Sequence, residues 1–138
     1  MSRVYAPTSP FFQKDARYSD FSVDFDVNPI TGNISRITDA KAINQSLKAI
    51  LLSSPGEKVY NRTFGSNLKN SLFELNDPIT IESVKSTIRS AIAANEPRIT
   101  IQDIRVDMQG NDMYVTLLYS IINIPEVYQT NITIARVR

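Results

Sequence analysis

Apolar residues recur at helical spacing in two stretches of the chain. Spacings of three and four residues place side chains on one face of a helix, so the pattern predicts two amphipathic helices. The first is expected to begin at Thr38 or Asp39, and Thr80 is a candidate N-cap of the second. The predicted buried faces are Ala40, Ile43, Leu47, Ile50 and Leu51 in the first helix, and Val84, Ile88, Ala91 and Ile92 in the second. The predicted polar face of the first helix carries Lys41, Asn44, Gln45 and Lys48.

Strict alternation of apolar and polar residues predicts a half-buried strand over residues 21–27. Its apolar face would consist of Phe21, Val23, Phe25 and Val27. Residues 28–33 carry Asn, Pro and Gly, which are turn-forming residues, and a short return strand over residues 34–37 would complete a hairpin.

The C-terminal third is rich in β-branched and aromatic residues. It predicts strands that begin at Ile99, cover residues 113–122 and cover residues 128–137, with a bulge near Asp103 and a hairpin turn at residues 109–112. Pro125 precedes the last strand, which we therefore expect near a sheet edge. Between the helices we expect a loop with a tight turn at Gly65 and a short helix carrying Leu68, Leu72 and Phe73.

These elements predict one α+β domain, in which helices pack on a mostly antiparallel sheet. A chain of 138 residues matches that size. Residues 21–138 would form the domain and residues 1–20 an extended arm. The arm carries aromatic residues in a polar setting, so it is either a frayed terminus or a segment that docks on a neighbour.

Composition excludes several classes of function. Lys and Arg number 15 against 14 Asp and Glu, so no basic field for nucleic acid is expected. The absence of Cys and His removes thiol nucleophiles, disulfides and the usual zinc sites. No apolar run is long enough for a membrane span and no signal-peptide core is evident, so we expect a protein made and kept in a cytoplasm, or in an assembly formed there. No phosphate loop or nucleophile elbow occurs, and we predict no cofactor, no metal and no enzymatic activity.

The triplet Glu96-Pro97-Arg98 places an acid and a base on either side of a rigid proline. Side chains held in this way suit charge-assisted hydrogen bonds to a partner at a defined angle. Two other interpretations stay open. Glu96 could pair with a cation on its own surface, or it could act as a glycosidase acid with Asp103 or Asp107.

The order of these elements resembles the GPW family of baseplate wedge proteins in contractile injection systems. A wedge subunit of T-even phages belongs to this family, and the E subunit of type VI secretion baseplates is a relative. The residues that carry the resemblance are Pro55-Gly56-Glu57-Lys58, Phe64-Gly65-Ser66-Asn67-Leu68, Leu72-Phe73-Glu74 and Asn95-Glu96-Pro97-Arg98-Ile99. Family members commonly have Arg where this chain has Lys58, which weakens any bidentate role there.

The resemblance implies a structural subunit of a phage tail baseplate, with a fold similar to the part of the sheath protein through which sheath subunits interlock. It implies that Glu96, Pro97 and Arg98 contact the helical core bundle of the wedge. It also implies that the domain templates the first sheath ring, and we predict that the last strand, through Thr130, Ile132, Thr133 and Ile134, faces the tail sheath protein.

Tail tube or hub proteins are further possible partners, and the expected location is the virion tail, assembled in the host cytoplasm. Because members of the family have carried a lysozyme label, the alternative is a lysozyme-like glycoside hydrolase of the baseplate.

Overall fold

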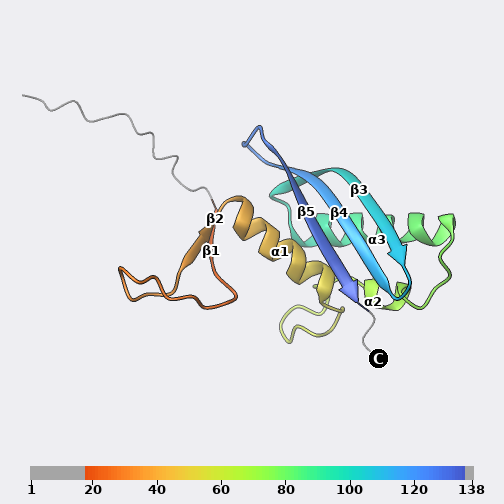
Figure 1. Ribbon diagram of the computed structural model, residues 1–138, viewed down its shortest axis with the longest axis horizontal. Helices are drawn as coiled ribbons and strands as arrows, with labels where there is room; N and C mark the ends of the chain where they lie inside the picture. The colour runs from red at the N-terminus through yellow and green to blue at the C-terminus, as the bar shows by residue number, and fades with distance from the viewer. Residues whose placement is uncertain (1–17, 136–138) are drawn as a thin grey trace, which may run out of the picture.

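The computed structural model describes residues 18–135 (Figure 1). The predicted arm over residues 1–20 therefore lies outside the described residues, except for its last three positions. The elements, in chain order, are β1 (Ser19–Phe21), β2 (Arg36–Thr38), α1 (Ala40–Leu52), α2 (Leu68–Ser71), α3 (Pro78–Asn95), β3 (Ile99–Gln109), β4 (Asp112–Ile121) and β5 (Val127–Ala135).

The body of the molecule has two layers. One layer is an antiparallel sheet with the strand order β3-β4-β5. The other layer contains α1 and α3, which pack against each other and lie on one face of this sheet, α1 in contact with β5 and α3 with β3 (Figure 1). This arrangement confirms the predicted α+β fold, a single domain with helices on an antiparallel sheet.

The core lies between these layers and follows the predicted periodicities. Along β4 every second side chain is buried, and the buried faces of the helices meet them. The buried set comprises Ile43, Leu47, Ile50 and Leu51 of α1, Val84, Ile88 and Ile92 of α3, and Met113, Val115, Leu117, Tyr119 and Ile121 of β4. The predicted helical faces are thus confirmed, except that Ala40 and Ala91 are only partly buried.

The bulge and the hairpin turn predicted for the main sheet are both present. The register between β3 and β4 shifts between Ile101 and Asp103, which confirms the expected bulge. Gly110 lies in the two-residue connection between Gln109 and Asp112 and has a φ of 63°, a conformation that glycine adopts without steric cost.

The N-terminus of α3 is capped by Asp77, and the predicted cap at Thr80 is wrong. The Asp77 carboxylate accepts a hydrogen bond from the Thr80 amide at 2.6 Å, and Pro78 follows as the first helical residue. Hydrogen bonds from the backbone of Thr80 hold the pKa of the Asp77 carboxyl below its usual value. The Asp-Pro pair is a helix-start signal that the sequence carried.

Replacing the cap should therefore destabilise α3. We expect Asp77→Ala to lower the melting temperature, because the Thr80 amide loses its acceptor. Thr80→Ala, the matched control, keeps the amide and the cap and should change the melting temperature much less. Equal effects of the two substitutions in thermal unfolding followed by circular dichroism would contradict this assignment.

The N-terminus of α1 has a different arrangement from the predicted cap. Asp39 occupies the capping position, but its side chain makes no capping hydrogen bond. Its carboxylate instead accepts from the Tyr18 amide at 3.3 Å, while the Asp39 amide donates to the Tyr18 carbonyl at 2.7 Å. These bonds continue the pairing of β1 with β2 and join the hairpin to the start of α1.

The N-terminal hairpin differs most from its prediction. The antiparallel pairing and the turn near Asn28 are confirmed, but β1 ends at Phe21 and only a single bridge, between Val27 and Ile34, follows it. The strand predicted over residues 21–27 is wrong, because the chain turns after Ser22 and Phe25 adopts a φ of 51°. Its apolar face is exposed, since the hairpin projects from the body and no second layer within residues 18–135 covers it (Figure 1). The exposed fractions are 54% for Phe21, 64% for Val23, 66% for Phe25 and 62% for Val27.

The loop between α1 and α2 folds back against the end of α1. The Ser66 hydroxyl donates to the Leu51 carbonyl at 3.0 Å, and the Ser66 amide donates to the Ser53 carbonyl at 2.9 Å. Gly65 precedes this contact with a φ of 110°, which confirms the tight turn expected there. The loop therefore satisfies carbonyl groups that the last turn of a helix leaves without partners.

Candidate interaction sites

The Glu96-Pro97-Arg98 triplet forms a closed ion pair at the end of α3. The Glu96 Oε1 atom accepts from Arg98 Nε at 2.5 Å, and Glu96 Oε2 accepts from the second guanidinium nitrogen at 2.6 Å. The Ser46 hydroxyl of α1 donates to the same Oε2 atom at 2.7 Å. Both carboxylate oxygens are thus occupied, and the bidentate geometry is the strongest arrangement for such a pair.

Burial and pairing act against each other on the Glu96 carboxyl. Its side chain is 2% exposed, and burial alone would raise its pKa. Hydrogen bonds from Arg98 and Ser46, together with the Arg98 charge, outweigh this effect, so the pKa of Glu96 lies below its usual value. The hydrogen bonds to Glu96 in turn raise the pKa of the Arg98 guanidinium. Glu96 is therefore held as a carboxylate.

Arg98 links this pair to the N-terminal part of the chain. Its side chain is 37% exposed, and its guanidinium lies 5.3 Å from the centre of the Tyr18 ring. Its carbonyl accepts from the Ile122 amide just beyond β4. One residue thus contacts the end of α3, the start of the hairpin and the end of the central strand.

The structure changes how the triplet can meet a partner. We expected Pro97 to present both charges outward, and for Glu96 this is wrong, because its carboxylate is turned into the protein toward Ser46. Pro97 is exposed and Arg98 is partly exposed, so these two residues carry the outward surface of the triplet. Sequence gave no signal for Ser46 as a partner, since it lies 50 positions away.

Glu96, Asp103 and Asp107 do not provide the acid pair that a glycosidase needs. A general acid needs a raised pKa, whereas that of Glu96 is lowered. Asp103 accepts from Arg105 Nε at 3.1 Å, and Asp107 lies exposed and accepts from Gln109. Within residues 18–135, no group of acidic or other metal-ligating side chains is arranged to hold a metal ion. None of the described helices is both long and apolar enough to cross a bilayer.

β5 is an edge strand, as predicted. It pairs with β4 from Val127 to Ala135, and no other strand among the described residues pairs with it. Thr130, Ile132 and Ile134 face the helices and are buried, whereas Thr133 is exposed on the open face. The side chains of the first three are therefore used by the core. What β5 offers to a partner is its outer backbone edge, with the side chains of its open face beside it.

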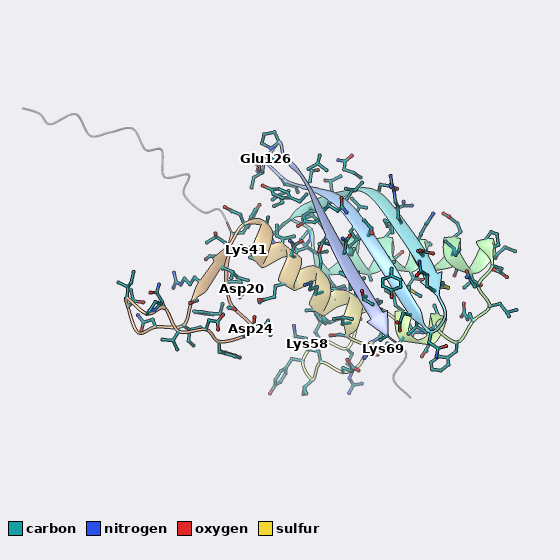
Figure 2. The ribbon with its side chains drawn as sticks, viewed as in Figure 1. Asp20, Asp24, Lys41, Lys58, Lys69 and Glu126 are labelled. Carbon is teal, nitrogen blue, oxygen red and sulfur yellow. The ribbon has the colours of Figure 1, made fainter. Side chains whose placement is uncertain are left out.

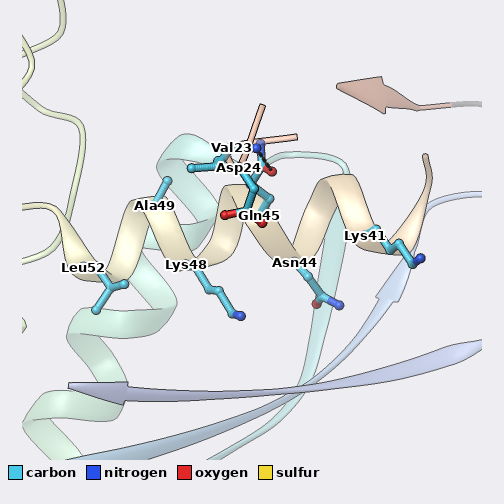
Figure 3. A pocket seen from close by; sticks show the side chains of 8 residues that line it. All are labelled: Val23, Asp24, Lys41, Asn44, Gln45, Lys48, Ala49 and Leu52. Atoms are coloured by element: carbon cyan, nitrogen blue, oxygen red, sulfur yellow. Dashed lines mark hydrogen bonds between the residues drawn. The ribbon is translucent and has the colours of Figure 1, made fainter. Parts of the chain in front are cut away.

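The outer side of α1 lies next to this edge and carries residues whose role the sequence did not indicate. Lys41, Asn44, Lys48 and Leu52 line a hollow of about 490 Å³, which Val23, Asp24, Gln45 and Ala49 complete (Figure 3). Gln45 joins the hairpin to the helix, since its amide donates to the Phe21 carbonyl at 2.9 Å and accepts from the Val23 amide. Figure 2 places Lys41 on α1 and Asp24 on the hairpin.

Fold and site together define an α+β protein with a projecting hairpin, an internal ion pair and a sheet edge with which no other described strand pairs. A sequence model of the family described as baseplate wedge protein gp25 matches residues 38–126 of the chain. The baseplate wedge protein gp25 of Enterobacteria phage T4 is 30% identical over 96 residues, which span 68% of this chain and 73% of that protein. The chain belongs to this baseplate wedge family, which confirms the resemblance and the structural baseplate role predicted from the sequence.

Solved structures share the fold at low sequence identity. A Geobacter sulfurreducens protein, named only provisionally as a tail lysozyme, has a TM-score of 0.66 at 17% identity and covers 74% of this chain and 96% of its own. A chain of the anti-feeding prophage baseplate has a TM-score of 0.61 at 16% identity, covering 88% and 87%. A chain of the postcontracted pyocin R2 baseplate has a TM-score of 0.51 at 15% identity, covering 80% and 96%.

Proposed function

We propose that this chain is the wedge subunit on which the tail sheath begins, and that it offers the outer edge of β5 to an arm of the tail sheath protein. The observation that carries this proposal is the outer edge of β5, which no strand of residues 18–135 pairs with, beside a well-packed β4. An edge strand of this length exposes unpaired amide and carbonyl groups, which a foreign strand can pair with. The alternating burial of Thr130, Ile132 and Ile134 fixes which face of an added strand meets the helices.

The end of α3 is the proposed contact with the core helical bundle of the wedge. Pro97 and the outer part of Arg98 form this surface, and Glu96 holds the guanidinium in one orientation from below. An arginine fixed in this way loses little side-chain entropy when it binds an acceptor on a partner. Tail tube or hub proteins are further proposed neighbours.

A structural role without enzymatic activity is supported over the lysozyme alternative. The carboxyl group best placed by sequence for acid catalysis, that of Glu96, is held ionised by Arg98 and Ser46. A general acid has to carry a proton at the working pH. The proposed location is the virion tail, after assembly in the host cytoplasm. The purified protein should leave the turbidity of a cell-wall suspension unchanged.

A proline in β5 tests the sheath contact. The amides of a strand alternate in direction. Met113 follows the hydrogen-bonded Gln109–Asp112 pair, so its backbone bonds Ile134 of β5, and the amide of the neighbouring Thr133 points toward the open edge. We expect Thr133→Pro to keep its native circular dichroism and to lose sheath recruitment, because it blocks pairing with an added strand.

The matched control is a proline at Val106 in β3, the other edge strand of the sheet. Gln109 pairs with Asp112 across the two-residue turn, so Asp107 bonds Tyr114, and the amide of its neighbour Val106 points away from β4. A control variant that stays folded should still recruit sheath. Polymerisation of sheath from baseplates that carry the folded β5 variant would show that this edge is not the template.

A further inference from the structure

The outer side of α1 forms a ridge that runs beside the free edge of β5. Lys41, Asn44, Lys48 and Leu52 follow one another at spacings of three, four and four residues, which places them in one row on the helix. Asn44 accepts a hydrogen bond from the buried Tyr119 hydroxyl of β4 at 2.6 Å, which fixes this row on the side of the sheet. Figure 3 shows Asn44, Lys48 and Leu52 pointing from α1 toward the side on which β5 runs.

The ridge carries positive charge that the described residues do not neutralise. Lys41 and Lys48 take part in no ion pair between residues 18 and 135, and the acidic residue that lines the same hollow, Asp24, lies on the hairpin side. The other described lysines have partners: Lys58 lies over the Phe64 ring, Lys69 pairs with Glu57 and Lys85 pairs with Glu82. Among the lysines of residues 18–135, the two without a partner are thus those beside the free strand edge.

A strand added to β5 would extend the sheet beyond its present edge and would lie over this ridge. Every second side chain of such a strand points toward the helical layer. Lys41 and Lys48 are seven residues apart, or about 10 Å along α1, which lies between the spacings of about 7 and about 13 Å for helix-facing strand positions two and four residues apart. Both lysines can therefore meet side chains of one short strand.

We propose that Lys41 and Lys48 bind carboxylates of the strand that pairs with β5, and so select an arm of the tail sheath protein with acidic residues at alternate, helix-facing positions. The proposal rests on the proposed function, because it requires that β5 accepts a partner strand. Leu52, which is 41% exposed, adds a preference for an apolar residue at the next helix-facing position. Backbone pairing supplies affinity, and the lysines determine which partner strand binds and in which register.

The test is the association rate of purified tail sheath protein with the purified wedge subunit, measured at low and high salt. Lys41→Glu with Lys48→Glu should slow association about tenfold at low salt, and the difference should fade as salt rises. Lys41→Arg with Lys48→Arg should stay close to the unchanged protein. The matched control is Arg62→Glu with Arg89→Glu, which reverses two exposed cations that do not line the hollow beside α1 and should have little effect.

A second change on the partner completes the test. Replacing the acidic residues of the sheath arm by lysine should restore association with the Lys41→Glu, Lys48→Glu variant. If the Lys41→Glu, Lys48→Glu variant associates as fast as the Arg62→Glu, Arg89→Glu control, the inference is overturned. Loss of binding by the folded β5 proline variant in the same assay would then show that the proposed function stands. Normal binding by the proline variant overturns both.

Discussion

Gly65→Ala should destabilise the fold by at least about 3 kcal/mol and lower the melting temperature by about 10 °C. A Cβ atom at this position would lie 2.6 Å from the Ser53 carbonyl oxygen, which is backbone and cannot turn away. The φ of 110° adds strain for any residue that has a side chain. Relief would require the loop to lift from α1, and Ser66 would then lose its bonds to Leu51 and Ser53.

Gly110→Ala is the matched control for this substitution. Gly110 also has a positive φ, of 63°, but an added Cβ would meet nothing within 4 Å. We expect a cost of about 1 kcal/mol from backbone strain alone. Thermal and chemical unfolding of both variants measure the difference. Equal losses of stability in the two variants would mean that the close approach of Gly65 to α1 adds nothing to the cost of the substitution.

Arg98→Met should cost about 2–3 kcal/mol near pH 7, because Ser46 is then the one side chain of residues 18–135 that still bonds the buried Glu96 carboxylate. We place the value below that for a fully buried pair, since Arg98 is 37% exposed and water can reach the vacated site. Adding Glu96→Gln to this variant should restore part of the loss, because a neutral amide costs less to bury. Arg105→Met is the matched control, since the side chain of its partner Asp103 is half-exposed, and it should produce no measurable change.

The Glu96–Arg98 ion pair also determines how the stability difference between wild type and Arg98→Met depends on pH. The pKa of Glu96 in the folded protein lies below its usual value of 4.5, so the pair contributes its full stability above that pH and loses it as the pH falls through the lowered pKa. Glu57, Asp77 and Asp103 also have lowered pKa values, but they are unchanged in the variant and cancel in the comparison. The gap between wild type and Arg98→Met should therefore narrow as the pH falls from the pKa of Glu96 in the variant, which lacks the Arg98 bonds that lower it, toward the lowered pKa of Glu96 in the wild type. A gap that stays constant down to about pH 3 would contradict the ion-pair account.

The main sheet and both long helices were predictable because their signals are local. The alternation along β4, the turn at Gly110 and the spacing of Ile43 and Leu47 each specify an element without reference to distant residues. The cap at Asp77 could have been found as well, since Asp before Pro is a helix-start signal. The same alternation failed over residues 21–27, because a period of two predicts an extended chain but not a second layer to cover it.

The candidate sites were harder to predict because they depend on contacts between distant elements. The triplet at Glu96 could be found by eye, but whether its carboxylate faces outward depends on Ser46 of α1. Asn44 was expected on the outer face of its helix, and only the fold brings Tyr119 to it from 75 positions away. The edge position of β5 was predictable from Pro125, whereas the lysines beside that edge became apparent only from the packing of α1 under the sheet.

A cryo-EM reconstruction of the assembled tail, at a resolution that separates strands, would show directly what pairs with β5. We expect a strand of the tail sheath protein hydrogen-bonded to the outer edge of β5, beside Lys41 and Lys48 of α1. Glu96 should stay paired with Arg98 inside this subunit, with Pro97 and the outer side of Arg98 against the core bundle. A β5 edge that is bare, or covered by a protein other than sheath, would show that this strand does not template the sheath.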